Sequence, residues 1–185
     1  MKYGINAYAV DVDELISMIG SHDVNFLNSL KFDIADDISR FKRNRQRPGD
    51  HDIEELLSFI VFNDLRPSKN NNADYAYALE LMCKGMGKAM YPEALRNLSR
   101  ERFVELHEIN ELGSRPGPLF NKIPWPDQVP RIGCIPNREM RDRYEVAMQL
   151  FTIQEDHNKK AYYHEYIGWL IEANKRGSGL VTFMY

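Results

Sequence analysis

The sequence has few cysteines and lacks any long apolar run. Cys83 and Cys134 are the two cysteines among 185 residues, and two thiols alone cannot complete a four-ligand zinc site. Since no signal peptide precedes them, we expect both thiols to be reduced. The longest apolar stretches, such as 56–62, fall far short of the roughly 20 residues that span a bilayer. These absences predict a cytoplasmic location and exclude a membrane-spanning helix.

The sequence also lacks an excess of positive charge. Lysine and arginine number 24 against 27 aspartate and glutamate residues, giving a net charge of −3, which disfavours general binding to nucleic acid. Five cationic side chains nevertheless fall within 40–47, among them Arg40 and Arg43. Because acidic residues precede the run and Pro48 follows it, the pattern is typical of the charged end of a helix. Nucleic-acid binding through this run is a third function class.

Catalytic and cofactor motifs are absent as well. The sequence contains no His-Glu-x-x-His, no Gly-x-Ser-x-Gly and no glycine-rich phosphate loop, so we expect no metal and no cofactor. His51, His107 and His164 each have carboxylates nearby in sequence, which could support acid–base chemistry, although solvated helix faces explain them more simply. Cys83 falls on an apolar stripe and is expected to be inert, whereas Cys134 lies in a proline-rich segment and could be accessible.

Much of the chain has apolar residues at the three- and four-residue spacing of helices. This spacing, with capping residues such as Asp11, Asp52, Asn72, Ser99 and Asn137, predicts helices. They cover 12–20, one long helix from 21 to 47, then 53–66, 73–87, 100–113, 138–151 and 154–175. In the last of these, Ile171 is expected to be buried.

Both ends of the chain are rich in residues that favour strands. The runs 3–10 and 179–185 are apolar, and 131–135 is a further short strand at a sheet edge. We therefore predict an α+β fold, predominantly α, in which six or seven helices pack around a small sheet that includes the N- and C-terminal strands. The length fits a single globular domain over 1–185.

A proline-rich segment at 114–137 contains six of the nine prolines. It is too apolar for a solvated linker, and we expect an ordered loop laid over the body of the protein. Trp125 lies between two prolines, and Asp127 and Arg131 follow it, a composition typical of a binding hot spot. The alternative is that Trp125 anchors the loop on the core.

Four segments carry a resemblance to a known family. They are YAVDVDEL at 8–15, DYAYALELMC at 74–83, PWPDQVPRIG at 124–133 and GLVTFMY at 179–185. With these segments the chain resembles an uncharacterised family of small bacterial proteins, a domain of unknown function. The resemblance implies a bacterial, cytoplasmic origin and brings no active site with it.

These observations favour a non-enzymatic protein-binding role. The expected contact residues for a protein partner are Trp125, Asp127, Arg131, Arg40 and Arg43. A narrower hypothesis is a bacterial immunity protein that neutralises a cognate toxin. The alternative is an enzyme or small-ligand-binding protein that uses a cleft of histidines and carboxylates.

Overall fold

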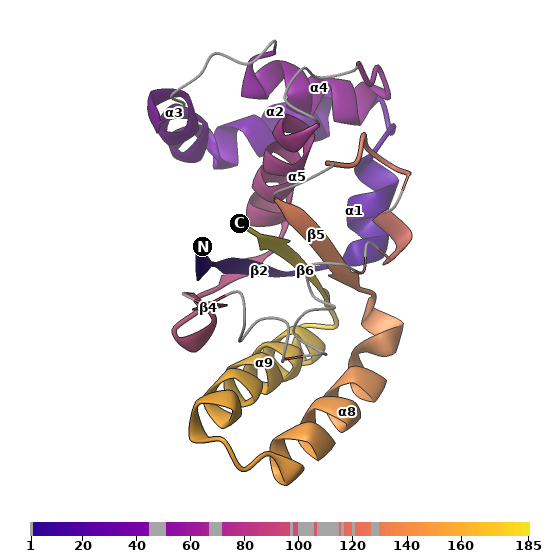
Figure 1. Cartoon of the computed structure of the whole chain (residues 1–185). Helices are drawn as coiled ribbons and strands as arrows, with labels where there is room; N and C mark the ends of the chain where they lie inside the picture. Colours follow the sequence, from indigo (N-terminus) through magenta and orange to yellow (C-terminus); the bar gives the residue numbers. More distant parts are fainter. Residues whose placement is uncertain are drawn as a thin grey trace.

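A four-stranded antiparallel sheet separates two layers of helices (Figure 1). The computed structural model describes residues 2–44, 51–66, 72–96, 98–99, 106, 115, 117–119, 121–126 and 130–185. The strand order is β3 (Lys88–Met90), β2 (Ile5–Val10), β6 (Gly179–Met184) and β5 (Arg131–Ile135). A separate two-stranded ladder joins β1 (Lys2–Tyr3) to β4 (Leu98–Ser99). The predicted α+β class, with paired terminal strands, is confirmed.

The central pair of strands has helices on both of its faces. Ile5 of β2 lies opposite Met184 of β6, and Val10 lies opposite Gly179. Because side chains alternate along a strand, odd and even positions enter different cores. Tyr8, Val10, Val181 and Phe183 belong to one core cluster, whereas Ile5, Ala7, Leu180 and Met184 belong to the other. Every residue of β6 is consequently buried.

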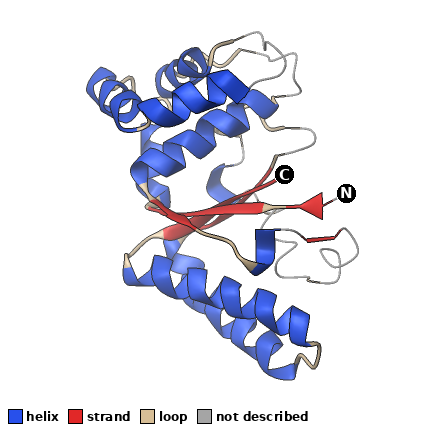
Figure 2. Cartoon of the chain, turned by 90° about the vertical axis from the view of Figure 1, so that its left-hand side faces the viewer, coloured by secondary structure: helices blue, strands red, loops and turns tan. Residues whose placement is uncertain are grey.

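Five helices lie on the first side of the sheet (Figure 2). They are α1 (Val12–Met18), α2 (Val24–Asp33), α3 (Ala35–Asn44), α4 (Ile53–Phe62) and α5 (Ala73–Met86), of which α1 and α5 contact the strands of the sheet. Asp11 caps α1 by accepting bonds from the backbone N–H groups of Asp13 and Glu14, each at 3.0 Å. Asp52 and Glu55 form the capping box that opens α4. Both predicted caps are confirmed.

The helices α8 (Met140–Ile153) and α9 (His157–Lys175) pack on the opposite face. They lie side by side as a helical hairpin (Figure 1), and Asp156 caps α9. Three short 3₁₀ turns, η1 (Ala94–Arg96), η2 (Gly117–Leu119) and η3 (Asn137–Glu139), complete the described elements. None of the described helices is long and apolar enough to cross a membrane.

The long helix predicted for 21–47 is wrong. The chain breaks between α2 and α3 at Ile34, where φ is −107° and ψ is 18°. The Ile34 N–H still bonds to the Leu30 carbonyl, and both residues remain buried with Leu27 and Ile38. The apolar stripe is therefore continuous although the helix is not, because α2 and α3 each pack against α4.

Two of the predicted asparagine caps make other contacts. Asn72 lies at the start of α5 in the left-handed conformation and makes no cap bond. Its side-chain Nδ2 instead donates to the Trp125 carbonyl at 3.1 Å. The side chain of Asn137 donates to the Gly177 carbonyl. Except for the buried Leu106, the helix predicted at 100–113 lies outside the described residues.

Candidate binding cavity

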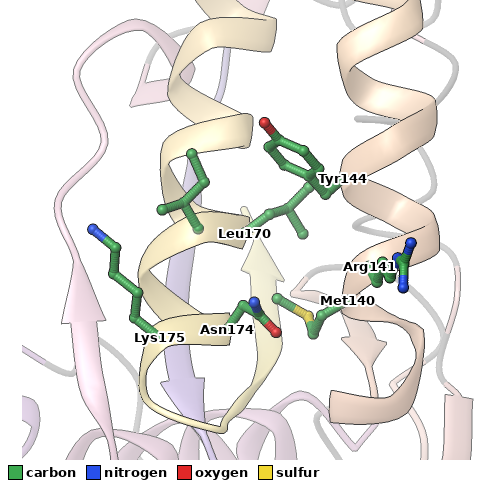
Figure 3. A pocket seen from close by; sticks show the side chains of 7 residues that line it. Met140, Arg141, Tyr144, Leu170, Asn174 and Lys175 are labelled. Atoms are coloured by element: carbon green, nitrogen blue, oxygen red, sulfur yellow. The ribbon is translucent and has the colours of Figure 1, made fainter.

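A cavity of about 360 Å³ lies between α8 and α9 (Figure 3). Helix α8 contributes residues of its first turns and α9 contributes residues of its last turns. The lining residues are Met140, Arg141, Tyr144, Leu170, Ile171, Asn174 and Lys175. The cavity lies on the side of the sheet that only two of the described helices cover.

The floor of the cavity is apolar. Met140 and Leu170 are each 1% exposed and belong to the core of this layer. Tyr144 is half-buried against the same core. Ile171 is 38% exposed, so the expectation that it is buried is wrong, because its side chain forms part of the cavity wall. An apolar group that entered here would leave water and contact buried carbon.

The rim of the cavity is polar and exposed. Arg141, Asn174 and Lys175 are all exposed, and Arg141 and Lys175 lie on opposite sides of the cavity (Figure 3). Arg141 Nε lies 3.1 Å from Glu145 Oε1, with side chains 85% and 56% exposed. Exposed pairs of this kind are weak. Among the described residues, Lys175 has no ion-pair partner.

Acidic side chains near the rim are already engaged by other cations. Glu172 lies 2.9 Å from both Lys88 Nζ and Arg176 Nε, and their hydrogen bonds lower the pKa of Glu172. Glu139 lies 2.9 Å from Arg115 Nη2. At the mouth of the cavity, Arg141 is therefore paired with Glu145, and Lys175 is the cation that the described acids leave unpaired.

The partner-binding residues predicted from sequence lie elsewhere. Trp125 is half-buried and packs against the core of the five-helix layer, which supports the anchoring interpretation. Arg131 is exposed at the start of β5, and Arg40 and Arg43 are exposed on α3. Asp127 lies outside the described residues. None of the four described residues lines the cavity.

The first part of the basic run forms the end of α3, as predicted. Acidic residues occupy the first turn of this helix, and Lys42 and Arg43 occupy the last turn. Lys42 Nζ lies 2.8 Å from Asp52 Oδ2 and 2.6 Å from Glu54 Oε1. Its hydrogen bonds to these carboxylates raise the pKa of Lys42. Residues 45–50 lie outside the described residues.

The sequence did not predict a half-buried polar cluster between α5 and the sheet. Glu80 of α5 accepts hydrogen bonds from Asn6 Nδ2 and the Tyr8 hydroxyl, each at 2.8 Å, and from the Tyr185 hydroxyl. Burial, followed by the charge of Glu80, raises the pKa of both tyrosines. The carboxylate oxygens of Glu80 therefore have hydrogen-bond partners, and the bonds from Asn6 and Tyr8 connect α5 to β2.

The histidines do not form one cleft in the described structure. His51 Nδ1 lies 4.0 Å from Glu55 Oε2, and its ring packs edge-on against Phe59 of α4. His164 lies on α9 against Phe151, on the other side of the sheet. His107 lies outside the described residues. Within the described ranges, no three His, Cys, Asp or Glu side chains are placed to hold a metal ion.

Both cysteines are buried free thiols. Cys83 is 0% exposed, as its position on the apolar stripe predicts, but Cys134 is only 1% exposed. Cys134 is therefore not accessible, although its place in the proline-rich segment allowed this, because its side chain belongs to the core of the five-helix layer. Burial raises the pKa of Cys134 to about 12 and that of Cys83 well above its usual value. Neither thiol has the lowered pKa of a nucleophile.

Comparison with known protein families identifies the family of this chain. Residues 1–185 match the model of DUF7691, a domain of unknown function. The chain belongs to this family. The resemblance inferred from the four sequence segments is thereby confirmed. No curated protein and no solved structure matches the chain, so any function has to be argued from the geometry.

The sequence contained only a weak signal for the cavity. Met140 and Tyr144 fall on the apolar face predicted for 138–151, and Leu170 falls on that predicted for 154–175. Arg141 and Lys175 follow the helical periodicity of ordinary solvated residues. Nothing in that periodicity indicates that the first turn of one helix and the last turn of another face a common space.

Proposed function

We propose that the protein is a non-enzymatic binding protein that recognises a protein partner through the cavity between α8 and α9. The observation that carries this proposal is an apolar, solvent-open cavity of about 360 Å³. Small-molecule sites usually range from roughly 300 to 1,000 Å³. This cavity lies at the lower end of that range, a size that suits one or two side chains projecting from a partner.

The composition of the cavity supports protein recognition. Interface hot spots are enriched in tyrosine and arginine around a desolvated centre, and here Tyr144 and Arg141 surround the buried Leu170 and Met140. A partner side chain on this floor would be shielded from water, whereas its neighbours would contact the polar rim. This arrangement resembles the apolar centre and polar rim of known interfaces.

A blocking substitution tests the proposal. Asn174 is exposed and lines the cavity, so Asn174→Trp is expected to fill the mouth without altering the buried floor. Asn158→Trp is the matched control, because Asn158 is also exposed and lies in the first turn of the same helix. Tagged wild-type protein and both variants would be used to capture partners from bacterial cells, with bound proteins identified by mass spectrometry.

The expected result is a stoichiometric protein that binds the wild type and Asn158→Trp but is lost with Asn174→Trp. Identical capture by all three forms would show that the cavity is not the binding site. Attention would then return to Trp125, Arg131, Arg40 and Arg43 as predicted contacts.

The immunity role is a narrower form of this proposal. It requires that the captured partner be toxic when expressed alone and harmless when co-expressed with this protein. The reduced, buried thiols of Cys83 and Cys134 support a cytoplasmic location for such a complex, since exposed disulfides are features of oxidising compartments.

A further inference from the structure

We infer that the partner segment recognised by the α8–α9 cavity is acidic: a large apolar side chain enters the cavity, and neighbouring carboxylates lie beside Arg141 and Lys175. This inference rests on the proposed function and specifies the chemistry of the partner.

The first argument is the placement of the two cations. Arg141 comes from α8 and Lys175 from α9, on opposite sides of the apolar floor (Figure 3). A segment that lies across the mouth would therefore pass one cation on each side. The pair between Arg141 and Glu145 is 3.1 Å long but highly exposed, so a partner carboxylate could compete with Glu145 at little cost.

The second argument is that the described acids beside the rim leave Lys175 unpaired, since Glu145 pairs with Arg141. Glu172 is held by Lys88 and Arg176, and Glu139 is held by Arg115. Lys175 has no ion-pair partner within the described ranges. A partner carboxylate would complement this charge.

The helix dipoles do not determine whether the cavity prefers a negatively or a positively charged ligand. The cavity touches the first turn of α8 and the last turn of α9, where the partial charges of the two helices are opposite in sign. Since these contributions largely cancel, the preference for an anion depends on the Arg141 and Lys175 side chains. Removing either side chain should then have a measurable effect.

A pair of fluorescent dyes separates the two properties of the site. Phenylnaphthylamine is a neutral aromatic probe, and anilinonaphthalene sulfonate presents the same ring system with an added anion. Titration of the full chain should show cavity binding of both dyes, each lost in Asn174→Trp and retained in Asn158→Trp. The sulfonate should bind more tightly, and only its binding should weaken between low salt and about 0.5 M salt.

Charge-removing variants then assign the effect to residues. Lys175→Met removes the charge and keeps the apolar stem of the side chain. The single variants Lys175→Met and Arg141→Gln should each weaken sulfonate binding about two- to five-fold. Binding of the neutral dye should stay the same. Lys122→Met, at an exposed lysine that does not line the cavity, is the matched control and should change the binding of neither dye.

Two peptides test whether a protein segment supplies the anion. The blocked hexapeptide Glu-Glu-Leu-Phe-Glu-Glu should displace the sulfonate dye at lower concentration than its isostere Gln-Gln-Leu-Phe-Gln-Gln, and this advantage should shrink in Lys175→Met. Equal competition by the two peptides would overturn the acidic segment. Native mass spectrometry that found a co-purified small molecule, displaced by the dye, would overturn a protein occupant.

The outcomes distinguish this inference from the proposed function. If the neutral dye binds and the sulfonate has no advantage, the cavity remains a binding site and the preference for an acid is wrong. If neither dye responds to Asn174→Trp, the inference fails together with the cavity. If capture is blocked by Asn174→Trp but unaffected by Lys175→Met and Arg141→Gln, only the acidic partner is excluded.

Discussion

The two helical layers cover the same sheet in different ways. On one face, α1 to α5 bury a continuous core whose central side chains, such as Leu57 and Leu79, are fully inaccessible. On the other face, α8 and α9 bury Leu170 equally well, yet this residue borders a cavity. Burial from water and close packing are therefore separate properties. Among the described residues, the α8–α9 layer combines a buried core with an open cavity.

The two layers also use carboxylates differently. Glu80 in the five-helix layer accepts bonds from Asn6 and Tyr8 of β2 and from Tyr185, which directly follows β6. Glu165 of α9 accepts bonds from three backbone N–H groups, those of Glu93 at 3.0 Å, Ala94 at 2.6 Å and Leu95 at 3.2 Å. The first carboxylate fixes a helix to the sheet, and the second fixes the η1 turn to a helix.

A matched pair of leucines should give the largest difference. Leu79→Ala on α5 is expected to lower the free energy of unfolding by about 4 kcal/mol, and Leu170→Ala on α9 by about 2 kcal/mol. Leu170 already faces empty space on one side, so its removal breaks fewer contacts. Urea unfolding of both variants measures the difference, and equal losses would mean that the α8–α9 layer is as tightly packed as the other.

Alkaline pH should next destabilise the five-helix layer through Tyr8 and Tyr185. Their pKa values are raised in the folded protein, so the stabilisation is complete below about pH 10 and is lost as the pH rises above this value. Each tyrosine should contribute up to about 1.4 kcal/mol per pH unit to the loss.

Unfolding measured from pH 9 to pH 12 checks this slope. It should become shallower in Tyr8→Phe and Tyr185→Phe and stay unchanged in Tyr91→Phe, where the ring is 85% exposed. The same slope in all forms would mean that other buried groups, such as Cys134, control alkaline unfolding.

The smallest effect is expected for the clamp between Glu165 and η1. Glu165→Gln should cost about 1 kcal/mol, because the amide retains one acceptor oxygen but loses the charge that strengthens the three bonds. Hydrogen exchange of the Ala94 and Leu95 amides should accelerate. The exposed Glu155→Gln should leave exchange unchanged, and a similar response in both variants would rule out the clamp.

The sequence predicted those features that depend on local rules. The strand-like runs at both termini, the edge strand at 131–135 and the caps at Asp11 and Asp52 were all found in the structure. Each follows from side-chain periodicity or from a carboxylate placed at a helix start, and each can be recognised within a few residues.

Features that depend on distant partners were not predictable in this way. Asn72 has the sequence position of a helix cap, but its side-chain amide donates a hydrogen bond to the Trp125 carbonyl. Ile34 continues an apolar stripe, yet the helix breaks there because both halves pack on α4. The cavity joins residues of two helices, and the Glu80 cluster joins α5 to β2 and Tyr185. Periodicity identifies the buried face of an element without identifying its neighbour.

The position of β6 has a consequence for how the protein is made. This strand lies between β2 and β5 in the sheet, although it comes last among the described elements, and Ile5 pairs with Met184. During synthesis, β2 would leave the ribosome long before its central neighbour exists. The helices on both faces would be synthesised before the strand against which they pack. Pairing of strands that lie far apart in the sequence is slow. Assembly of the sheet should therefore follow synthesis of the helices on both of its faces.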